Sequence, residues 1–83
     1  MQAREFLQSI VESLVEYPGD VRIEQKEDEL GTLVTLRVHQ SDMKTIIGRA
    51  GQTVMALRTI LRVFGSRQGL RVNLKVEDEE SAR

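Results

Sequence analysis

The sequence has no cysteine and a single histidine, His39, among its 83 residues. Disulfides and thiolate metal sites are therefore excluded, and one imidazole alone completes neither a transition-metal site nor a nucleophile–base pair. The carboxylates gather at Glu27, Asp28 and Glu29 and again from Glu77, in a turn and a tail where solvated charge is the ordinary role. We therefore expect no catalytic residue, no metal and no cofactor, and we do not expect an enzyme.

Long apolar runs and aromatic residues are also scarce. No stretch approaches the roughly 20 residues that cross a bilayer, and the segment MQAREFLQS lacks the apolar run of a signal peptide. We expect a cytoplasmic protein with no membrane partner. Only Phe6, Tyr17 and Phe64 are aromatic, too few for the base-stacking platforms of RRM and OB domains.

The net charge of −1 hides a segregation of charge along the chain. Residues 1–41 hold four Lys and Arg side chains against eight acids, and residues 77–83 hold one against four. Residues 42–76 hold seven against Asp42 alone. A local basic segment attracts phosphate even in a nearly neutral protein, so the pattern indicates an anionic partner, with a solvated basic face as the alternative.

Hydropathy periodicity predicts six elements in a chain of one-domain size. An amphipathic helix over residues 3–16 ends at Pro18-Gly19, and two alternating segments around a polar turn from Lys26 to Gly31 form a hairpin. The rest are a short helix starting at Ser41-Asp42 and ended by Gly48, a helix over residues 52–64 closed by Gly65, and a strand over residues 70–76.

The order α-β-β-α-α-β predicts an α+β fold, a two-layer sandwich with three helices on one face of a three-stranded sheet. The last strand is reached across two helices, so it can lie parallel to its neighbour in a mixed sheet. We expect one domain over residues 1–78 and a short, acidic, disordered tail over residues 79–83.

The loop between the two later helices is the best candidate site. Gly48 and Gly51 enclose only Arg49 and Ala50, and such a tight turn needs glycine backbone angles. It exposes the first turn of the next helix, whose unpaired N–H groups and positive dipole end attract phosphate. Arg49 adds a charge and Ala50 keeps the loop low. Two glycines alone are weak evidence, and an ordinary helix connector is the alternative.

The stretch Ile46-Ile47-Gly48-Arg49-Ala50-Gly51-Gln52-Thr53-Val54 resembles the signature of KH domains, an aliphatic pair followed by a GxxG loop and a helix. The resemblance continues to Leu61, and the element order is that of the type II KH arrangement. The whole chain is most similar to the small bacterial single-KH RNA-binding proteins of the KhpA, or YlqC, family. Ala50 departs from the pattern, because a polar residue is expected there.

The resemblance implies a single-stranded RNA partner, with about four nucleotides clamped by the loop against an apolar groove. That groove is expected between the short helix, the loop and the strand over residues 33–39, with one of the two isoleucines serving the groove and the other the core. Arg58 and Arg62 either extend the phosphate track or are solvated. The implied RNA-binding residues are Lys44, Ile46, Ile47, Gly48, Arg49, Ala50, Gly51, Gln52, Thr53 and Arg58.

The resemblance also implies RNA-dependent regulation or RNA chaperone activity, and pairing with a second KH protein linked to cell growth and cell shape. The alternative function is a dimerising adaptor in which RNA binding is secondary. It is supported by Ala56, Ile60 and Val63, which widen the apolar arc of the helix over residues 52–64 beyond what a core needs. These three residues are the expected interface of a homodimer or heterodimer. The basic segment favours RNA, because an adaptor gives no reason for it.

Overall fold

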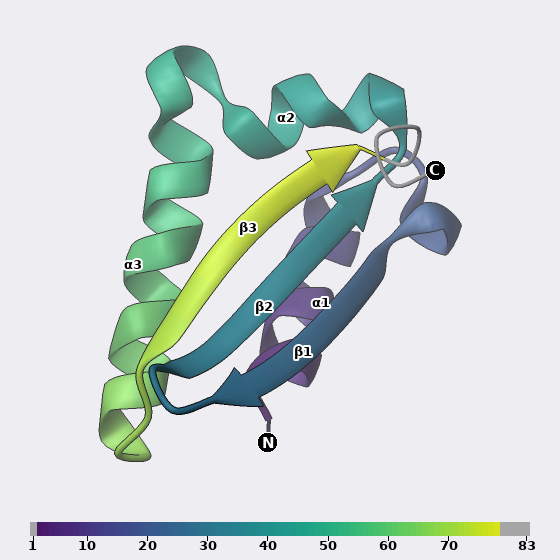
Figure 1. Cartoon of the computed structure of the whole chain (residues 1–83). Helices are drawn as coiled ribbons and strands as arrows, with labels where there is room; N and C mark the ends of the chain where they lie inside the picture. Colours follow the sequence, from purple (N-terminus) through teal and green to yellow (C-terminus); the bar gives the residue numbers. More distant parts are fainter. Residues whose placement is uncertain (1, 79–83) are drawn as a thin grey trace.

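The computed structural model describes residues 2–78, which form a three-stranded sheet with its helices packed behind one face (Figure 1). Three short 3₁₀ turns, at Pro18–Asp20, Gln40–Asp42 and Arg49–Gly51, join the longer elements. Those elements are α1 (Ala3–Leu14), β1 (Arg22–Asp28), β2 (Gly31–Val38), α2 (Met43–Ile47), α3 (Gln52–Arg67) and β3 (Val72–Asp78). The predicted order and the two-layer α+β architecture are confirmed.

The sheet has the strand order β1-β2-β3 and mixed direction. β1 pairs antiparallel with β2, whereas β3 pairs parallel with β2, with Thr32 opposite Val72 and Val38 opposite Asp78. The mixed sheet is confirmed. Because β2 is central, β3 is an edge strand, and α3 runs beside it in Figure 1.

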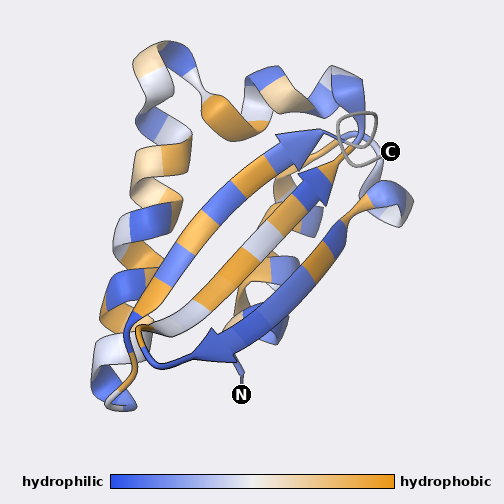
Figure 2. Cartoon of the chain, viewed as in Figure 1, coloured by the Kyte–Doolittle hydropathy of each residue, from blue (hydrophilic) through white to orange (hydrophobic). Residues whose placement is uncertain are grey.

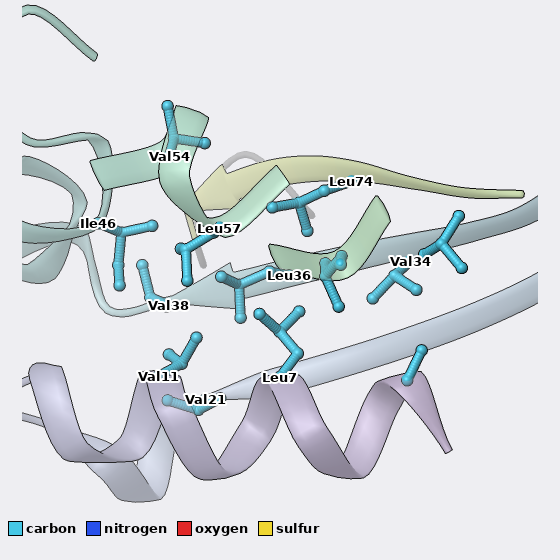
Figure 3. Close-up of a cluster of buried hydrophobic side chains, with 13 residues drawn as sticks. Leu7, Val11, Val21, Val34, Leu36, Val38, Ile46, Val54, Leu57 and Leu74 are labelled. Carbon is cyan, nitrogen blue, oxygen red and sulfur yellow. The ribbon is translucent and has the colours of Figure 1, made fainter. Parts of the chain in front are cut away.

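The core lies between the sheet and the helices. Alternate residues of β2, Val34, Leu36 and Val38, are fully buried, and Leu7 and Val11 of α1 point at them from the other layer (Figure 3). Each such side chain contributes about 1.5–3 kcal/mol when it leaves water. Figure 2 shows the alternation of apolar and polar residues along β2 and β3 that produces this one-sided burial.

The hairpin turn is shorter than the predicted polar turn. Lys26 continues β1 opposite Leu33, so only Glu29 and Leu30 lie between the strands. The Asp28 carboxylate accepts hydrogen bonds from the backbone N–H groups of Leu30, at 2.8 Å, and of Gly31. These side-chain bonds close the hairpin directly after Asp28, the last residue of β1.

Gly65 does not close α3, which is a second correction. The helix continues to Arg67, and Gly65 is buried against the following strand. A Cβ there would lie 2.5 Å from Cγ2 of Val72 and 2.9 Å from the carbonyl oxygen of Leu70. The glycine therefore permits the close approach of helix and strand, and a glycine inside a helix need not end it.

Other element ends also differ from the prediction. α1 ends at Leu14, before Pro18, because its C-cap Val15 is already extended. β3 starts at Val72 and takes in Glu77 and Asp78, so the acidic run begins inside the sheet. The expected tail over residues 79–83 lies outside the described residues. Across residues 2–78 no helix is long and apolar enough to cross a membrane.

Asp42 occupies the N-cap position of α2, which agrees with the predicted start of the short helix. Its side chain makes no cap hydrogen bond to that helix and is almost completely buried, with a relative exposure of 2%. The carboxylate instead accepts from the backbone N–H of Glu16, at 2.9 Å, and from that of Tyr17, at 3.1 Å. It ties the end of α1 to the start of α2, and so positions the helix that leads into the glycine loop.

Candidate nucleic-acid interface

The connection from α2 to α3 turns sharply at Gly48. The Gly48 N–H donates to the carbonyl of Lys44, at 2.8 Å, and the residue has φ 76° and ψ 173°. A Cβ at this position would overlap the Thr53 hydroxyl and lie 2.8 Å from the Thr53 backbone nitrogen. Both the backbone angle and the lack of space therefore require glycine.

The second half of the loop places two more residues in the left-handed region. Gly51 has φ 77°, and its N–H donates to the carbonyl of Gly48, at 3.2 Å. Ala50 has φ 55° and ψ 26°, an angle that the sequence did not signal. For a non-glycine residue this conformation costs about 1–2 kcal/mol. The unusual feature of Ala50 is thus its backbone angle as well as its missing polar group.

The loop presents the N-terminus of α3, a helix of 16 residues, to solvent. Its N-cap, Gly51, provides no side chain, so the backbone N–H groups of Thr53 and Val54 have no side-chain cap. The Arg49 side chain is exposed and forms no hydrogen bond or ion pair with residues 2–78, whereas the Arg49 carbonyl accepts from the Gln52 N–H. Aligned peptide dipoles add about half a positive charge at such a terminus, so helix and arginine together suit an anion.

The two isoleucines before the loop have different environments. Ile46 is fully buried in the core, whereas Ile47 is 40% exposed. Ile46 therefore has no surface for a ligand and holds α2 on the sheet, while Ile47 offers an aliphatic surface beside the loop. Lys44, one turn before Gly48, is also exposed, and so is Gln52 at the start of α3.

The strand that borders this region is β3, which corrects the expected groove. Residues 33–39 belong to the central strand and its end, and β2 has a neighbour on each side. β3 is the edge strand beside α3 (Figure 1), and the Arg58 Nε lies 3.4 Å from the Leu74 carbonyl oxygen. Arg58 thus reaches across the edge of β3. Sequence periodicity missed this border because it predicts strands but not their order in a sheet.

Ion pairs neutralise basic side chains on the open face of the sheet. Arg37 pairs with Glu24 at 2.7 Å and with Glu77 at 3.1 Å, and Lys75 pairs with Glu77 at 3.0 Å. Hydrogen bonds from Lys75 and then Arg37 hold the pKa of the Glu77 carboxyl below its usual value, and those from Arg37 to Glu24 and Glu77 raise the pKa of the guanidinium. Lys44, Arg49 and Arg58, on α2, in the loop and on α3, take part in none of the ion pairs among residues 2–78.

An apolar hollow lies on a different face of α3, where it meets α1. The rings of Phe6 and Phe64 stack with centroids 4.7 Å apart. Next to them Ile60 is 41% exposed and Val63 57% exposed. The hollow has a volume of about 360 Å³ and is lined by Phe6, Thr59, Ile60, Val63, Phe64 and Arg67. The predicted interface residues Ile60 and Val63 are thus side by side, and Ala56 is exposed one turn earlier.

Among the described residues no cluster of His, Asp and Glu could hold a metal ion. His39 lies against Tyr17, with ring centroids 4.2 Å apart, and its Nδ1 accepts the backbone N–H of Ser41 at 3.0 Å. The histidine thus caps the 3₁₀ turn that precedes α2. Its contacts are structural.

Comparison with known sequences agrees with this geometry. The sequence model of the family described as "KhpA/KhpB, KH domain" matches residues 4–76. The chain is 36% identical over 77 residues to "RNA-binding protein KhpA" of Chlamydia pneumoniae, covering 93% of this chain and 99% of that protein. It is 39% identical over 74 residues to the protein of the same name from Borreliella burgdorferi, covering 89% and 90%.

A solved structure shares the fold. A crystal structure of an Aquifex aeolicus Era variant superimposes with a TM-score of 0.62 at 18% identity, over 92% of this chain. The chain spans only 29% of that Era chain, so the likeness concerns one part of it. At this identity it shows the fold alone.

A mixed sheet in the order β1-β2-β3, with a GxxG loop joining two helices beside the parallel edge strand, defines a type II KH domain. Within that class, the family match over residues 4–76 and the identities above 30% over most of the chain are specific. The chain belongs to the KhpA/KhpB KH domain family.

Proposed function

We propose that this protein binds single-stranded RNA by holding the sugar-phosphate backbone at residues 48–51, without catalysing a reaction. The observation that carries the proposal is the position of Arg49, exposed and unpaired within residues 2–78 and next to the uncapped N-terminus of α3. The names of the relatives support RNA as the ligand class. A KH loop of this kind clamps about four nucleotides.

The surroundings of the loop fit a single strand better than a duplex. Ile47 supplies an aliphatic surface for bases, and the Arg58 side chain reaches the Leu74 carbonyl at the edge of β3. Single-stranded recognition depends on bases that are free to leave a stack and lie on such a surface. The backbone contacts proposed around the glycines come from Lys44, Gln52, Thr53 and Arg58.

The test is the double substitution Arg49→Asp with Ala50→Asp. It replaces one positive charge by two negative charges beside a helix N-terminus, so phosphate should be repelled. The fold should survive, because both side chains are exposed and aspartate tolerates the left-handed angle of residue 50. Fluorescence anisotropy with short unstructured RNAs measures binding, and circular dichroism confirms folding.

The matched control is Arg4→Asp with Gln8→Asp on the exposed face of α1, which changes the net charge equally. The control should bind RNA within about twofold of the wild type, because general charge repulsion is screened beyond about 8–10 Å. If the loop variant is folded and binds as tightly as the control, residues 48–51 are not the RNA site.

The proposal extends to the setting of the protein. Residues 1–78 form one KH domain, residues 79–83 are a short acidic tail, and the protein acts in the cytoplasm in RNA-dependent regulation or as an RNA chaperone. These roles require reversible binding to many transcripts, and a backbone clamp with few aromatic groups suits such binding.

Pairing with a second KH protein is favoured by one observation, the apolar hollow beside Ile60 and Val63. Only Arg67 among its lining residues is charged, and contiguous exposed apolar surface on a small domain marks an interaction site. Pairing through Ala56, Ile60 and Val63, with a second copy or a related chain, would join two grooves. The second groove would then add affinity through effective concentration.

A further inference from the structure

A second basic pocket lies where α3 ends and β3 begins. It is open, has a volume of about 550 Å³ and is lined by Arg62, Ser66, Gly69, Leu70, Arg71, Val72 and Asn73. The sequence marked Arg62 as a candidate for the phosphate track but did not indicate the pocket, because Arg71 lies beyond the turn that follows α3, just before β3. The fold brings both arginine residues to the lining of one hollow.

Both arginines are available to a ligand. The ion pairs among residues 2–78 involve Arg37 and Lys75 but neither Arg62 nor Arg71, and no acidic side chain lines the pocket. The Ser66 hydroxyl and the Asn73 amide add neutral hydrogen-bonding groups. Two unpaired guanidinium groups with a hydroxyl suit a phosphate, which arginine binds through paired N–H donors.

The pocket also has an apolar component. Leu70 is 45% exposed at its rim, and Val72 forms part of its lining. A free inorganic anion has no use for such a surface, whereas a nucleotide carries both a phosphate and a base that can lie against aliphatic side chains. The lining therefore fits a nucleotide better than a phosphate ion.

The end of α3 carries a negative dipole, which opposes an anion, but its effect is weak here. The dipole amounts to about half a charge, against two full charges from the arginines. The last carbonyls of the helix are also occupied, since Gly65 accepts from the N–H groups of Gln68 and Leu70 and Ser66 accepts from that of Gly69. The balance at the pocket favours negative ligands.

The pocket lies at the opposite end of α3 from the glycine loop (Figure 1). Arg58, Arg62 and Ser66 recur every four residues along the side of α3 that faces β3, so two arginines lie between the glycine loop and the far end of the pocket. The helix is about 24 Å long at 1.5 Å per residue, a distance that about seven stacked nucleotides cover at about 3.4 Å each.

We infer that the Arg62–Arg71 pocket is a second phosphate-binding subsite for the same RNA strand, which leaves the glycine loop, follows α3 and is held again at the start of β3. This inference rests on the proposed function and extends it from a clamp of about four nucleotides to a track along the whole helix. Arg62 and Arg71 bind the distal phosphate, and Leu70 supports the adjoining base.

The experiment compares RNAs of about four and about ten nucleotides, the second long enough to span α3. The wild type should bind the longer RNA more tightly and with a log-log salt slope steeper by about 1.4, for two further charged contacts on a single strand. Arg62→Ala with Arg71→Ala should weaken binding of the longer RNA about tenfold and restore the shallower slope, while binding of the four-nucleotide RNA stays within about twofold.

The control, Arg4→Ala with Arg22→Ala, removes the same charge from α1 and β1. This control should still bind the longer RNA more tightly than the shorter one. If the Arg62 and Arg71 variant still binds the longer RNA more tightly, the inference is overturned and the higher affinity is assigned to another surface, such as the groove of a paired copy. An equal loss of affinity for the four-nucleotide and the ten-nucleotide RNA in this variant also overturns the inference. If the four-nucleotide RNA does not bind the wild type at all, the proposed function fails.

A final arm uses adenosine monophosphate as a competitor, to separate an RNA strand from a free nucleotide. If the subsite belongs to the strand, the mononucleotide should compete only weakly, because it lacks the second attachment at the loop. Tight binding of the mononucleotide that depends on Arg62 and Arg71, without any gain from RNA length, would assign the pocket to a free nucleotide and overturn the inference.

Discussion

The Tyr17 ring stacks on the His39 ring, with ring centroids 4.2 Å apart, although 22 positions separate the two residues in the sequence. The backbone N–H of the same tyrosine donates to the buried carboxylate of Asp42. The two contacts fix the turn after α1 against the start of α2. α2 has only five residues, so its direction depends on these neighbours more than on its own helix propensity.

Asp42→Ala should therefore destabilise the fold. The substitution leaves the N–H groups of Glu16 and Tyr17 without their partner, and each unsatisfied donor costs about 1–3 kcal/mol. We expect a loss of about 2–4 kcal/mol in the free energy of unfolding, measured by urea denaturation. Asp20→Ala, a partly buried carboxylate in the same region, is the control and should cost much less. Equal losses would show that the Asp42 bonds are replaced by water.

The two glycines of the loop should respond differently to alanine. Gly48→Ala places a Cβ against Thr53 at a positive φ, so we expect a cost of about 3 kcal/mol. Gly51→Ala meets no atom within 4 Å and should cost only the left-handed angle, about 1–2 kcal/mol. Thermal denaturation measures both. A cost at Gly51 as large as that at Gly48 would mean that steric space does not set the difference.

Arg49→Ala tests the loop more mildly than the double aspartate change. The substitution removes about one phosphate contact, so RNA affinity should fall similarly for all sequences and the log-log salt slope should decrease by roughly 0.7. Anisotropy titrations at several salt concentrations measure the slope. Arg67→Ala, on a face of α3 away from the loop, should leave the slope unchanged. An unchanged slope for Arg49→Ala would remove this arginine from the contact.

Ile60→Asp should abolish self-association if α3 pairs with a second copy. The side chain is 41% exposed beside an apolar hollow, so the charge should be tolerated in the monomer but not in an interface. Sedimentation at a few tens of micromolar, chosen to favour a typical weak dimer, measures the state. Met55→Asp, exposed on another side of the same helix, is the matched control. A wild type that remains monomeric contradicts the homodimer.

Deletion of residues 79–83 should leave both stability and RNA binding nearly unchanged. Apart from Ala82 the segment has no apolar side chain to pack, and its charge opposes phosphate. Truncation after Val76 instead removes Glu77 of β3, which pairs with Arg37 of β2 and with Lys75, and should lower the melting temperature. A large loss from the shorter deletion would show that the tail docks on the domain.

Periodicity in the sequence was sufficient for the element order and for most of the core. Alternation in β2 marked Val34, Leu36 and Val38, and the spacing in α1 marked Leu7 and Val11, because both patterns follow directly from backbone geometry. The glycine spacing also located the loop. The prediction that Gly65 ends the helix was wrong, because glycine is favoured both at helix ends and at places of close packing.

Several site features could not be predicted from the sequence, because they depend on which segments meet in space. The buried role of Asp42 needs the turn after α1 beside it, and the edge position of β3 needs the strand order. The left-handed angle of Ala50 is imposed by its neighbours against the preference of alanine. The pocket formed by Arg62 and Arg71 likewise exists only when α3 and β3 are joined.

The parallel pairing of β2 with β3 also bears on how the chain folds. Each paired residue in β3 lies 40 positions after its partner in β2, from Thr32 with Val72 to Val38 with Asp78. The β1–β2 hairpin closes a far shorter loop, so its entropic cost is lower and it can form first. The sheet is completed only when residues 72–78 are available. During synthesis the apolar face of the hairpin therefore stays partly uncovered until the chain beyond the glycine loop has been made. Assembly of the loop and completion of the sheet are therefore parts of one late, cooperative step.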